Sequence, residues 1–196
     1  VVAFQSLAAN LSALDTGNSN QDVFSRNIQI GQTESNQTYL VSVNKDGTGG
    51  GNRNSTSPVI SANGNVVVFA SNASNLNSLD TSTTQDLFAR NLQISQTAAN
   101  QTYLVSVNKF GTGGGNNMSS NPSISADGNT VAFVSTASDL HSLDPTTNTN
   151  IDVFARNIQI AQTAANQTYL VSVNKDGTAS ANGFSNSAVI SGDGTT

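Results

Sequence analysis

The sequence predicts an all-β fold, a β-propeller with about three four-stranded blades per chain. Three observations predict it. A unit of about 64 residues occurs three times, each unit divides into strand-like segments joined by turn residues, and no segment keeps the periodicity of an amphipathic helix. Four strands per unit, several with apolar residues on both faces, are typical of propeller blades that pack face to face.

The repeat is anchored by the string YLVSVNK, which starts at Tyr39, Tyr103 and Tyr169 and each time follows Asn-Gln-Thr. The first two copies are 64 residues apart and the last two are 66 apart. The difference falls in a single connection, which predicts that this connection is an exposed loop. In each unit it runs between two aspartates: Asp15 and Asp22, Asp80 and Asp86, and Asp144 and Asp152.

The four strands of a unit are clearest in the third copy. The first is expected at Pro122–Ala126 and ends in an Asp-Gly turn, which is a strong hairpin signal. Its partner, Thr130–Ser135, is rich in β-branched and aromatic residues. The other two strands are expected at 152–162 and 167–174, and glycine-rich linkers such as GTGGGN at Gly47 lead from one unit to the next.

The repeats divide the chain, 1–196, into units of roughly 1–57, 58–121 and 122–187, with 188–196 as the first strand of a further blade that residues 1–6 would complete. Three blades are too few to close a ring, so the chain is expected to be half of a six-bladed ring. Two explanations stay open: two copies exchange terminal strands to form a two-fold symmetric homodimer, or the chain is an excerpt of a longer array. Exchange that does not close would give a polymer, and a lone monomer is disfavoured because it would leave two apolar edges unpaired.

The segment PSISADGNTVAFVSTASDL from Pro122, followed by DVFARNI from Asp152, resembles the TolB-type (WD40-like) β-propeller repeat. In that family a Pro-x-(Trp)-Ser-x-Asp-Gly hairpin precedes an apolar strand and an Asp-(Ile/Val)-(Phe/Tyr) strand. The resemblance covers nearly the whole chain and implies a six-bladed ring whose hairpin strand lies nearest the central channel. It implies no catalytic residues, because the family mostly binds proteins or ligands. The chain departs from the motif at the usual tryptophan, where it has Ile60, Ile124 and Ile190.

Composition excludes several classes of function. Only 10% of the residues are charged, against roughly a quarter in an average domain, and the net charge is −5. The cations are few and scattered, so nucleic acid is not an expected partner. The chain has no cysteine, which excludes disulfides and thiolate metal sites, and no apolar run reaches the ~18 residues of a membrane span.

The hairpin residues Asn63, Asp127 and Asp193 are the candidate ligand-binding residues, because they are expected to ring one mouth of the channel. Arginines recur four positions after the aspartates that close the variable loop, as in Asp86 and Arg90. Positions i and i+4 share a face of a strand, which predicts an ion pair that joins neighbouring blades or pins a loop, with ligand binding as the alternative.

No cofactor is expected, with one alternative at the variable loop. The aspartates at its two ends, with neighbouring Asn side chains and carbonyls, are ligand types that calcium prefers. Capping of Asx turns is the favoured explanation, because the spacing varies and no D-x-D-x-D-G pattern occurs. His141 is the single histidine, and no catalytic set can be built around it.

The predicted function is therefore a non-enzymatic interaction or ligand-binding module. Scarce lysine with abundant Asn, Ser, Thr and Gly favours a secreted or cell-envelope protein. Its expected partners are a second copy of itself, and another protein or a glycan. Two alternatives stay open: a self-assembling extracellular protein that forms a filament or surface layer, and a polysaccharide-active enzyme with a site at the channel mouth.

Overall fold

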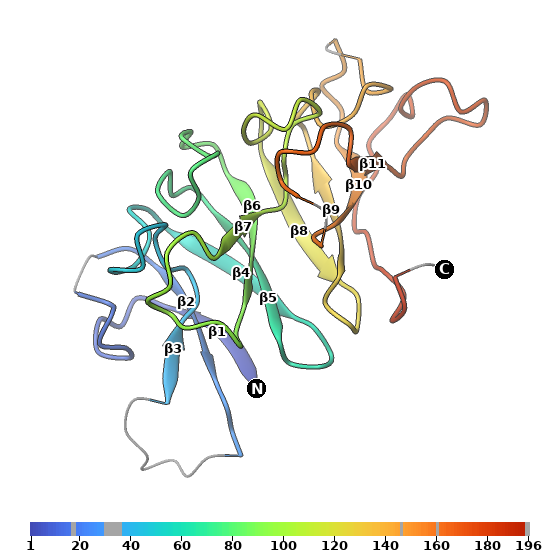
Figure 1. Cartoon of the computed structure of the whole chain (residues 1–196). Helices are drawn as coiled ribbons and strands as arrows, with labels where there is room; N and C mark the ends of the chain where they lie inside the picture. Colours follow the sequence, from blue (N-terminus) through green and yellow to red (C-terminus); the bar gives the residue numbers. More distant parts are fainter. Residues whose placement is uncertain (17–18, 30–36, 146, 160, 195–196) are drawn as a thin grey trace.

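Three separate antiparallel sheets make up the chain, and they stand side by side (Figure 1). The computed structural model describes residues 1–16, 19–29, 37–145, 147–159 and 161–194 of the 196. Blade 1 has the strand order β1-β2-β3, blade 2 has β4-β5-β6-β7, and blade 3 has β8 to β11 in sequence order. The strands are β1 Val2–Ser6, β2 Asp22–Arg26, β3 Thr38–Leu40, β4 Ser55–Ile60, β5 Val66–Ser71, β6 Asp86–Asn91, β7 Thr102–Leu104, β8 Ser119–Ile124, β9 Thr130–Ser135, β10 Asp152–Asn157 and β11 Thr168–Leu170.

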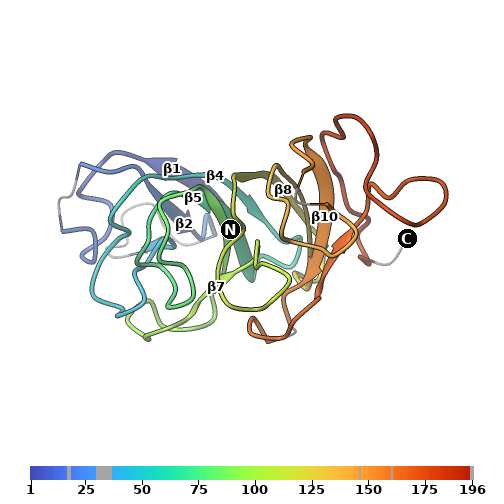
Figure 2. The same cartoon turned by 90° about the horizontal axis from the view of Figure 1, so that it is seen from above.

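This architecture is part of a β-propeller, so the predicted fold class is confirmed. Figure 2 shows blade 2 between blades 1 and 3, with the sheets packed through their faces. Within the described ranges the chain forms no helix, and hence none long and apolar enough to cross a membrane.

The hydrophobic core lies between the blades, which is why β5 is buried along its whole length. Val66, Val68 and Ala70 of β5 pack toward blade 3, whereas the alternate residues Val67 and Phe69 belong to the cluster shared with blade 1. Successive side chains of a strand point to opposite faces of its sheet, so a blade with two neighbours needs apolar residues at consecutive positions. The run VVVF in β5 meets that need.

The first strand of each complete blade begins earlier than the sequence predicts. Strand β8 starts at Ser119, ahead of the expected Pro122, because the strand continues through a bulge. Asn121 takes a left-handed conformation (φ 50°), and the pairing with β9 shifts register between Ser120 and Ser123. A bulge is one of the few places where a strand accepts proline, which has no N–H to donate. The partner strand β9 has the predicted bounds.

The last two strands are shorter than the predicted ranges 152–162 and 167–174. Strand β10 ends at Asn157, whose side-chain oxygen accepts a hydrogen bond from the Gln159 N–H (2.8 Å) and so starts a turn. Strand β11 ends at Leu170, because the next two N–H groups both donate to the Val153 carbonyl (2.8 and 3.3 Å) in place of a regular ladder.

The segment 185–190 repeats the first strand of a blade but has no sheet partner among the described residues. The Ser185 N–H donates to the Ile151 carbonyl, as the Ser119 N–H of β8 donates to the carbonyl of Gln85 one repeat earlier. Ser187 is left-handed (φ 59°), as the bulge residue Asn121 of β8 is. The segment therefore shares one backbone hydrogen bond and the left-handed residue with β8, although it forms no strand. At the other end of the assembly, β1 is an edge strand that pairs only with β2.

Candidate binding sites at the turns and blade junctions

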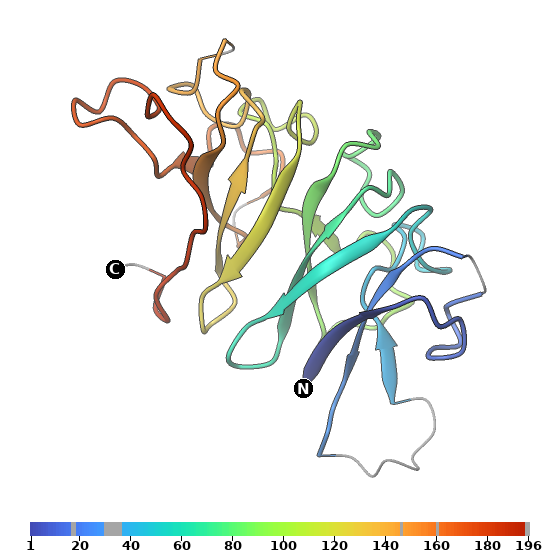
Figure 3. The same cartoon turned by 180° about the vertical axis from the view of Figure 1, so that it is seen from behind.

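Asn63 lies in the hairpin turn between β4 and β5, Asp127 in the turn between β8 and β9, and Asp193 in the turn after the segment 185–190. The three turns lie along one edge of the molecule (Figure 3). The Asn63 side-chain amide donates to the Asp127 carbonyl (2.9 Å), and the Ala126 N–H donates to the Gly192 carbonyl (2.8 Å). Neighbouring turns are thus bonded to one another. The structure brings Asn63 and Asp127 together and places Asp193 in the next turn of the same row.

Each of these side chains has a structural task in its own turn. The Asp127 carboxylate accepts hydrogen bonds from the Ser125 hydroxyl (2.6 Å) and from the Asn129 N–H (3.0 Å), and these bonds lower its pKa. Asp193 accepts the corresponding bond from the Ser191 hydroxyl (2.7 Å). Such Asx bonds hold the turn in place. Ligand binding by the row stays a prediction.

The repeated arginines fix the loop that follows their own strand. Arg90 is buried in β6, where its guanidinium donates to the Thr102 hydroxyl (3.0 Å) and to the carbonyls of Ser95 (3.2 Å) and Gln96 (3.0 Å). Arg156 makes the same set of contacts one repeat later. Burial lowers the pKa of Arg90 to about 10, so it stays protonated at neutral pH.

The predicted ion pairs with the preceding aspartates are wrong in blades 2 and 3. In the part of the chain that the structure describes, no ion pair joins Asp86 to Arg90 or Asp152 to Arg156. Positions i and i+4 of a strand share a face but lie about 13 Å apart, so the two side chains do not meet.

Glutamines from these loops join neighbouring blades, a role that the sequence analysis missed. The Gln162 side-chain oxygen of blade 3 accepts from the Leu104 N–H of β7 (2.7 Å) and from the Asn77 amide (2.9 Å) of blade 2. The Gln96 oxygen of blade 2 accepts from the Leu40 N–H of β3 in the same way (2.7 Å). The signal for this role is the recurrence of Gln-Thr at one position of each unit.

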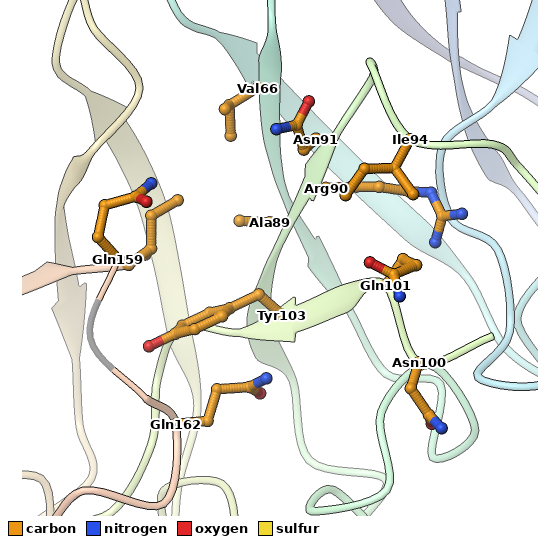
Figure 4. A pocket seen from close by; sticks show the side chains of 11 residues that line it. Val66, Ala89, Arg90, Asn91, Ile94, Asn100, Gln101, Tyr103, Gln159 and Gln162 are labelled. Carbon is orange, nitrogen blue, oxygen red and sulfur yellow. The ribbon is translucent and has the colours of Figure 1, made fainter. Parts of the chain in front are cut away.

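A cavity of about 220 Å³ lies at the junction of blades 2 and 3 (Figure 4). Tyr103 lies along one side of it, with Gln159 and Gln162 from blade 3 opposite and Gln101 and Asn100 from blade 2 nearby. A second cavity of about 220 Å³ occurs at the junction of blades 1 and 2, where Tyr39 takes the place of Tyr103. The lining residues there are Val1, Ser25, Asn27, Tyr39, Gly64, Asn65, Leu92 and Gln93.

The lining of the blade 2–3 cavity combines polar side chains with the apolar side chains of Val66, Ala89, Ile94 and Ile158, and it is almost uncharged. Of the side chains that line it, Arg90 alone is charged, and it is already bonded to Thr102 and the loop carbonyls. The Tyr103 hydroxyl accepts from Arg156 (3.3 Å), which holds the ring at the junction. Side-chain amides donate and accept hydrogen bonds, and an aromatic ring offers an apolar face. This arrangement suits a ligand that is polar but neutral.

The variable loop brings two aspartates together in blades 2 and 3. In blade 2 the Asp80 carboxylate accepts from the Ser82 N–H (2.9 Å), which confirms the predicted Asx turn for this residue. Asp86 accepts from the Ser106 hydroxyl (2.6 Å). Burial, and secondarily the neighbouring Asp80 charge, raises the pKa of Asp86 to about 8, and burial also raises the pKa of Asp80. In the described ranges no three acidic or histidine side chains come together, so a cation here would need neutral oxygens besides the two carboxylates.

His141 caps a turn at the start of the blade 3 loop. Its ring Nδ1 accepts from the Leu143 N–H (3.1 Å), and partial burial lowers its pKa. These contacts give the histidine a structural task.

No family model matches the chain, and no curated protein matches its sequence. Among solved structures it is similar to a protein from Agrobacterium tumefaciens that carries a provisional TolB assignment, with a TM-score of 0.41 and 11% identity. The match covers 78% of this chain and 41% of that protein, so the chain spans less than half of its length. At this level the likeness carries no argument about function.

Proposed function

We propose that the chain is a non-enzymatic binding module whose ligand is a neutral glycan held at the blade junctions. The observation that carries this proposal is the recurrence of one cavity at both junctions, with Tyr39 and Tyr103 in equivalent places. A site that repeats with the blade fits a ligand that itself repeats, and a glycan chain is such a ligand. The TolB-type hairpin motif is consistent with a binding role and stays part of the proposal.

The lining chemistry supports a glycan. Sugar hydroxyls both donate and accept hydrogen bonds, which matches the side-chain amides of Gln101, Gln159 and Gln162, and the C–H face of a sugar ring packs well on an aromatic ring such as Tyr103. Cavities that bind drug-sized molecules are usually larger, at about 300–1,000 Å³. A cavity of about 220 Å³ therefore fits one sugar unit of a chain that continues along the surface.

Tyr103→Ala is the test, with Tyr169→Ala as the matched control. Tyr169 holds the same position in the repeat and is 61% exposed, but it faces no further blade in the described part of the chain. Isothermal titration with neutral tetrasaccharides of glucose and of N-acetylglucosamine, chosen after a glycan array, should show at least about tenfold weaker binding for Y103A and no change for Y169A. Circular dichroism verifies that both variants fold.

Absence of binding on the array and in the titrations would overturn the proposal, as would an equal loss in both variants. Binding of an extended peptide at the same tyrosines would show that the grooves are used but that the glycan class is wrong. The turn residues are tested in parallel: Asp127→Ala removes one of the two exposed carboxylates of the row and should leave glycan affinity unchanged if the junctions bind the ligand.

A location outside the cytoplasm is part of the same proposal. It is supported by the low content of charged residues, 10%, and the abundance of Asn, Ser, Thr and Gly. Cell fractionation of the native host, followed by immunodetection, should find the protein in the envelope or the medium. A cytoplasmic protein would contradict it.

A second candidate is self-association by strand addition, which the two open edges favour. In blade 3 the edge of β9 is covered by β8, but the equivalent edge of β1 has no strand beside it in the described residues. The segment 185–190 repeats the sequence of a first strand, has the left-handed residue of its bulge at Ser187, and leaves Val189 88% exposed. We infer that the segment of one copy pairs with β1 of another.

Light scattering at micromolar concentration tests this second candidate. A closed exchange of two copies gives about twice the chain mass of 20.1 kDa, and open-ended exchange gives larger species. Val189→Lys should abolish association, because a charge on a strand edge blocks pairing, whereas Val171→Lys, at a site 57% exposed in blade 3, should not. A wild-type chain that stays monomeric at every concentration would overturn it.

A further inference from the structure

Blade 2 buries two carboxylate oxygens that have no hydrogen-bond partner. They are Oδ2 of Asp80 and Oδ2 of Asp86, on side chains that are 2% and 0% exposed. The other oxygen of each group is occupied, by the Ser82 N–H and the Ser106 hydroxyl respectively. The two carboxyl groups are near enough for the Asp80 charge to act on Asp86. Burying a carboxylate without a compensating partner costs several kcal/mol, so the pair calls for an occupant.

Blade 3 shows what fills the equivalent place. The Asn148 side-chain amide donates to Asp144 Oδ1 (2.8 Å) and to Asp152 Oδ2 (2.6 Å), and it also reaches the Ser180 hydroxyl (2.9 Å). Asp152 Oδ1 keeps the same serine partner as in blade 2, here Ser172 (2.6 Å). The two blades thus share the aspartates and differ in what lies between them.

Blade 2 lacks both filling groups. Its variable loop is two residues shorter and has no counterpart of Asn148, and Gly114 stands where blade 3 has Ser180. A Cβ on Gly114 would lie 2.5 Å from Asp86 Oδ2, and a Cβ on the adjacent Gly113 would lie 3.3 Å from the Leu79 carbonyl oxygen. The Asp86 carboxylate therefore lies directly against the backbone at Gly114, where blade 3 carries the Ser180 side chain.

We infer that blade 2 binds a divalent cation, with Ca²⁺ preferred, between Asp80 Oδ2 and Asp86 Oδ2. The cation takes the bridging position that the Asn148 amide holds between the two aspartates of blade 3. Two carboxylates balance its charge, and neutral oxygens of backbone carbonyls or water complete a coordination that Ca²⁺ accepts readily. With only two acidic ligands, the affinity should be that of extracellular calcium modules, a Kd of about 10⁻⁴–10⁻³ M.

Blade 1 has the same residue types at these positions, with Asp15 and Asp22 buried and Gly50 beside the Asp22 carboxylate. Independently of blade 1, a variant in blade 2 should remove one bound ion per chain. Blade 3 serves as the internal control.

The experiment compares Asp80→Asn in blade 2 with Asp144→Asn in blade 3. The D80N variant should still fold well, because the new amide can donate to Asp86 as Asn148 donates to the aspartates of blade 3. Isothermal titration with CaCl₂ should show one site fewer per chain in D80N than in the wild type, and an unchanged number in D144N. At a hundredfold excess of Ca²⁺ over Kd, the wild-type melting temperature should rise by about 5–10 °C relative to EDTA.

Mg²⁺ in the same titration should bind more weakly, because it demands a tighter octahedral set of ligands. The proposal is overturned if neither ion binds up to 10 mM, on the order of ten times the expected Kd, or if D80N keeps the wild-type number of sites. If no ion binds and D80N is also more stable than the wild type, the two carboxylates share a proton instead.

Discussion

Blades 2 and 3 place the same pair of aspartates beside the same serine, yet their surroundings differ. In blade 3 one amide, from Asn148, bridges the two carboxylates at 2.8 and 2.6 Å. In blade 2 the second oxygens of Asp80 and Asp86 are buried without a hydrogen bond. The repeating strands hold the carboxylates in place, and the loop between the aspartates, which is the part that varies, decides how their charge is compensated.

The difference shows how a repeat protein can vary one site while keeping its scaffold. The strand sequences tolerate little substitution, because side chains of β5 and β9 belong to the hydrophobic core between the blades. A loop can gain two residues at low cost, since insertions in exposed connections leave the core untouched. Blade 3 uses its longer loop to supply a neutral donor, and the shorter loop of blade 2 has no counterpart of it.

The largest expected effect is a change in the free energy of unfolding with pH, and its source lies in blade 2. Its cause is Asp86, whose pKa is raised to about 8 by burial and by the charges of Asp80 and Asp139. The folded chain then holds a proton that the unfolded chain releases near pH 4, so in EDTA the free energy of unfolding should fall between about pH 4 and 8, by about 1.4 kcal/mol per pH unit at most. Urea unfolding at several pH values measures it.

Asp86→Asn is the control, because an amide does not titrate and the slope should largely disappear. Added Ca²⁺ should flatten the wild-type profile at the upper end of this range, since a bound cation stabilises the ionised carboxylates. A wild-type stability that is level from pH 4 to 8 in EDTA would contradict the raised pKa.

The next largest effect is expected when the amide that compensates the two buried carboxylates of blade 3 is removed. Asn148→Ala removes the donor that two buried carboxylates share, so it should lower the free energy of unfolding by about 3 kcal/mol in urea at pH 7. Thr149→Ala, an exposed neighbour in the same loop, is the control. Because N148A makes blade 3 resemble blade 2, Ca²⁺ should recover part of the loss; a loss below about 0.5 kcal/mol would show that the bridge is unimportant.

Much of the fold could be predicted from the sequence, because repetition multiplies weak local signals. The Asp-Gly hairpin at Asp127 and the β-branched run Thr130–Ser135 sit in the structure where the sequence places them. The ends of strands were less predictable. The bulge at Asn121 and the turn that stops β10 at Asn157 depend on side-chain hydrogen bonds and register, which a pattern of apolar residues does not encode.

The candidate sites were less predictable than the fold, and for a physical reason. Sorting residues by repeat position identified the aspartate pairs, but Asn148 and Ser180 break the repeat and gave no signal. The junction cavities bring Tyr103 together with Gln159 and Gln162, more than 50 residues away in the sequence. Contacts of that kind depend on how one blade packs on the next.

Gly114→Ala should have a smaller effect, in blade 2. The new Cβ would lie 2.5 Å from Asp86 Oδ2, so the carboxylate must shift, and overpacking of this kind costs about 1–3 kcal/mol. The same variant should weaken Ca²⁺ binding at this site. Gly183→Ala is the matched control, because nothing lies within 4 Å of the added carbon there. Equal stability of both variants would show that the space beside Asp86 is wider than described.

The smallest effect is expected from Ser180→Ala in blade 3. The hydroxyl donates to Asp144 Oδ1 at 3.2 Å and accepts from Asn148 at 2.9 Å, but that carboxylate oxygen keeps its shorter bond to Asn148 at 2.8 Å. Losing one of two partners should cost about 1 kcal/mol in urea unfolding.

The double variant S180A/N148A tests whether Ser180 and Asn148 jointly compensate the charge of Asp144. Both bond to Asp144, so the double variant should lose more than the sum of the single losses, because only then is Asp144 Oδ1 left with neither partner. Additive losses would mean that Ser180 contributes independently of the amide. In that case Asn148 of the loop would account by itself for the difference in charge compensation between the blades. Gly114 would then matter only because it puts no side chain beside Asp86.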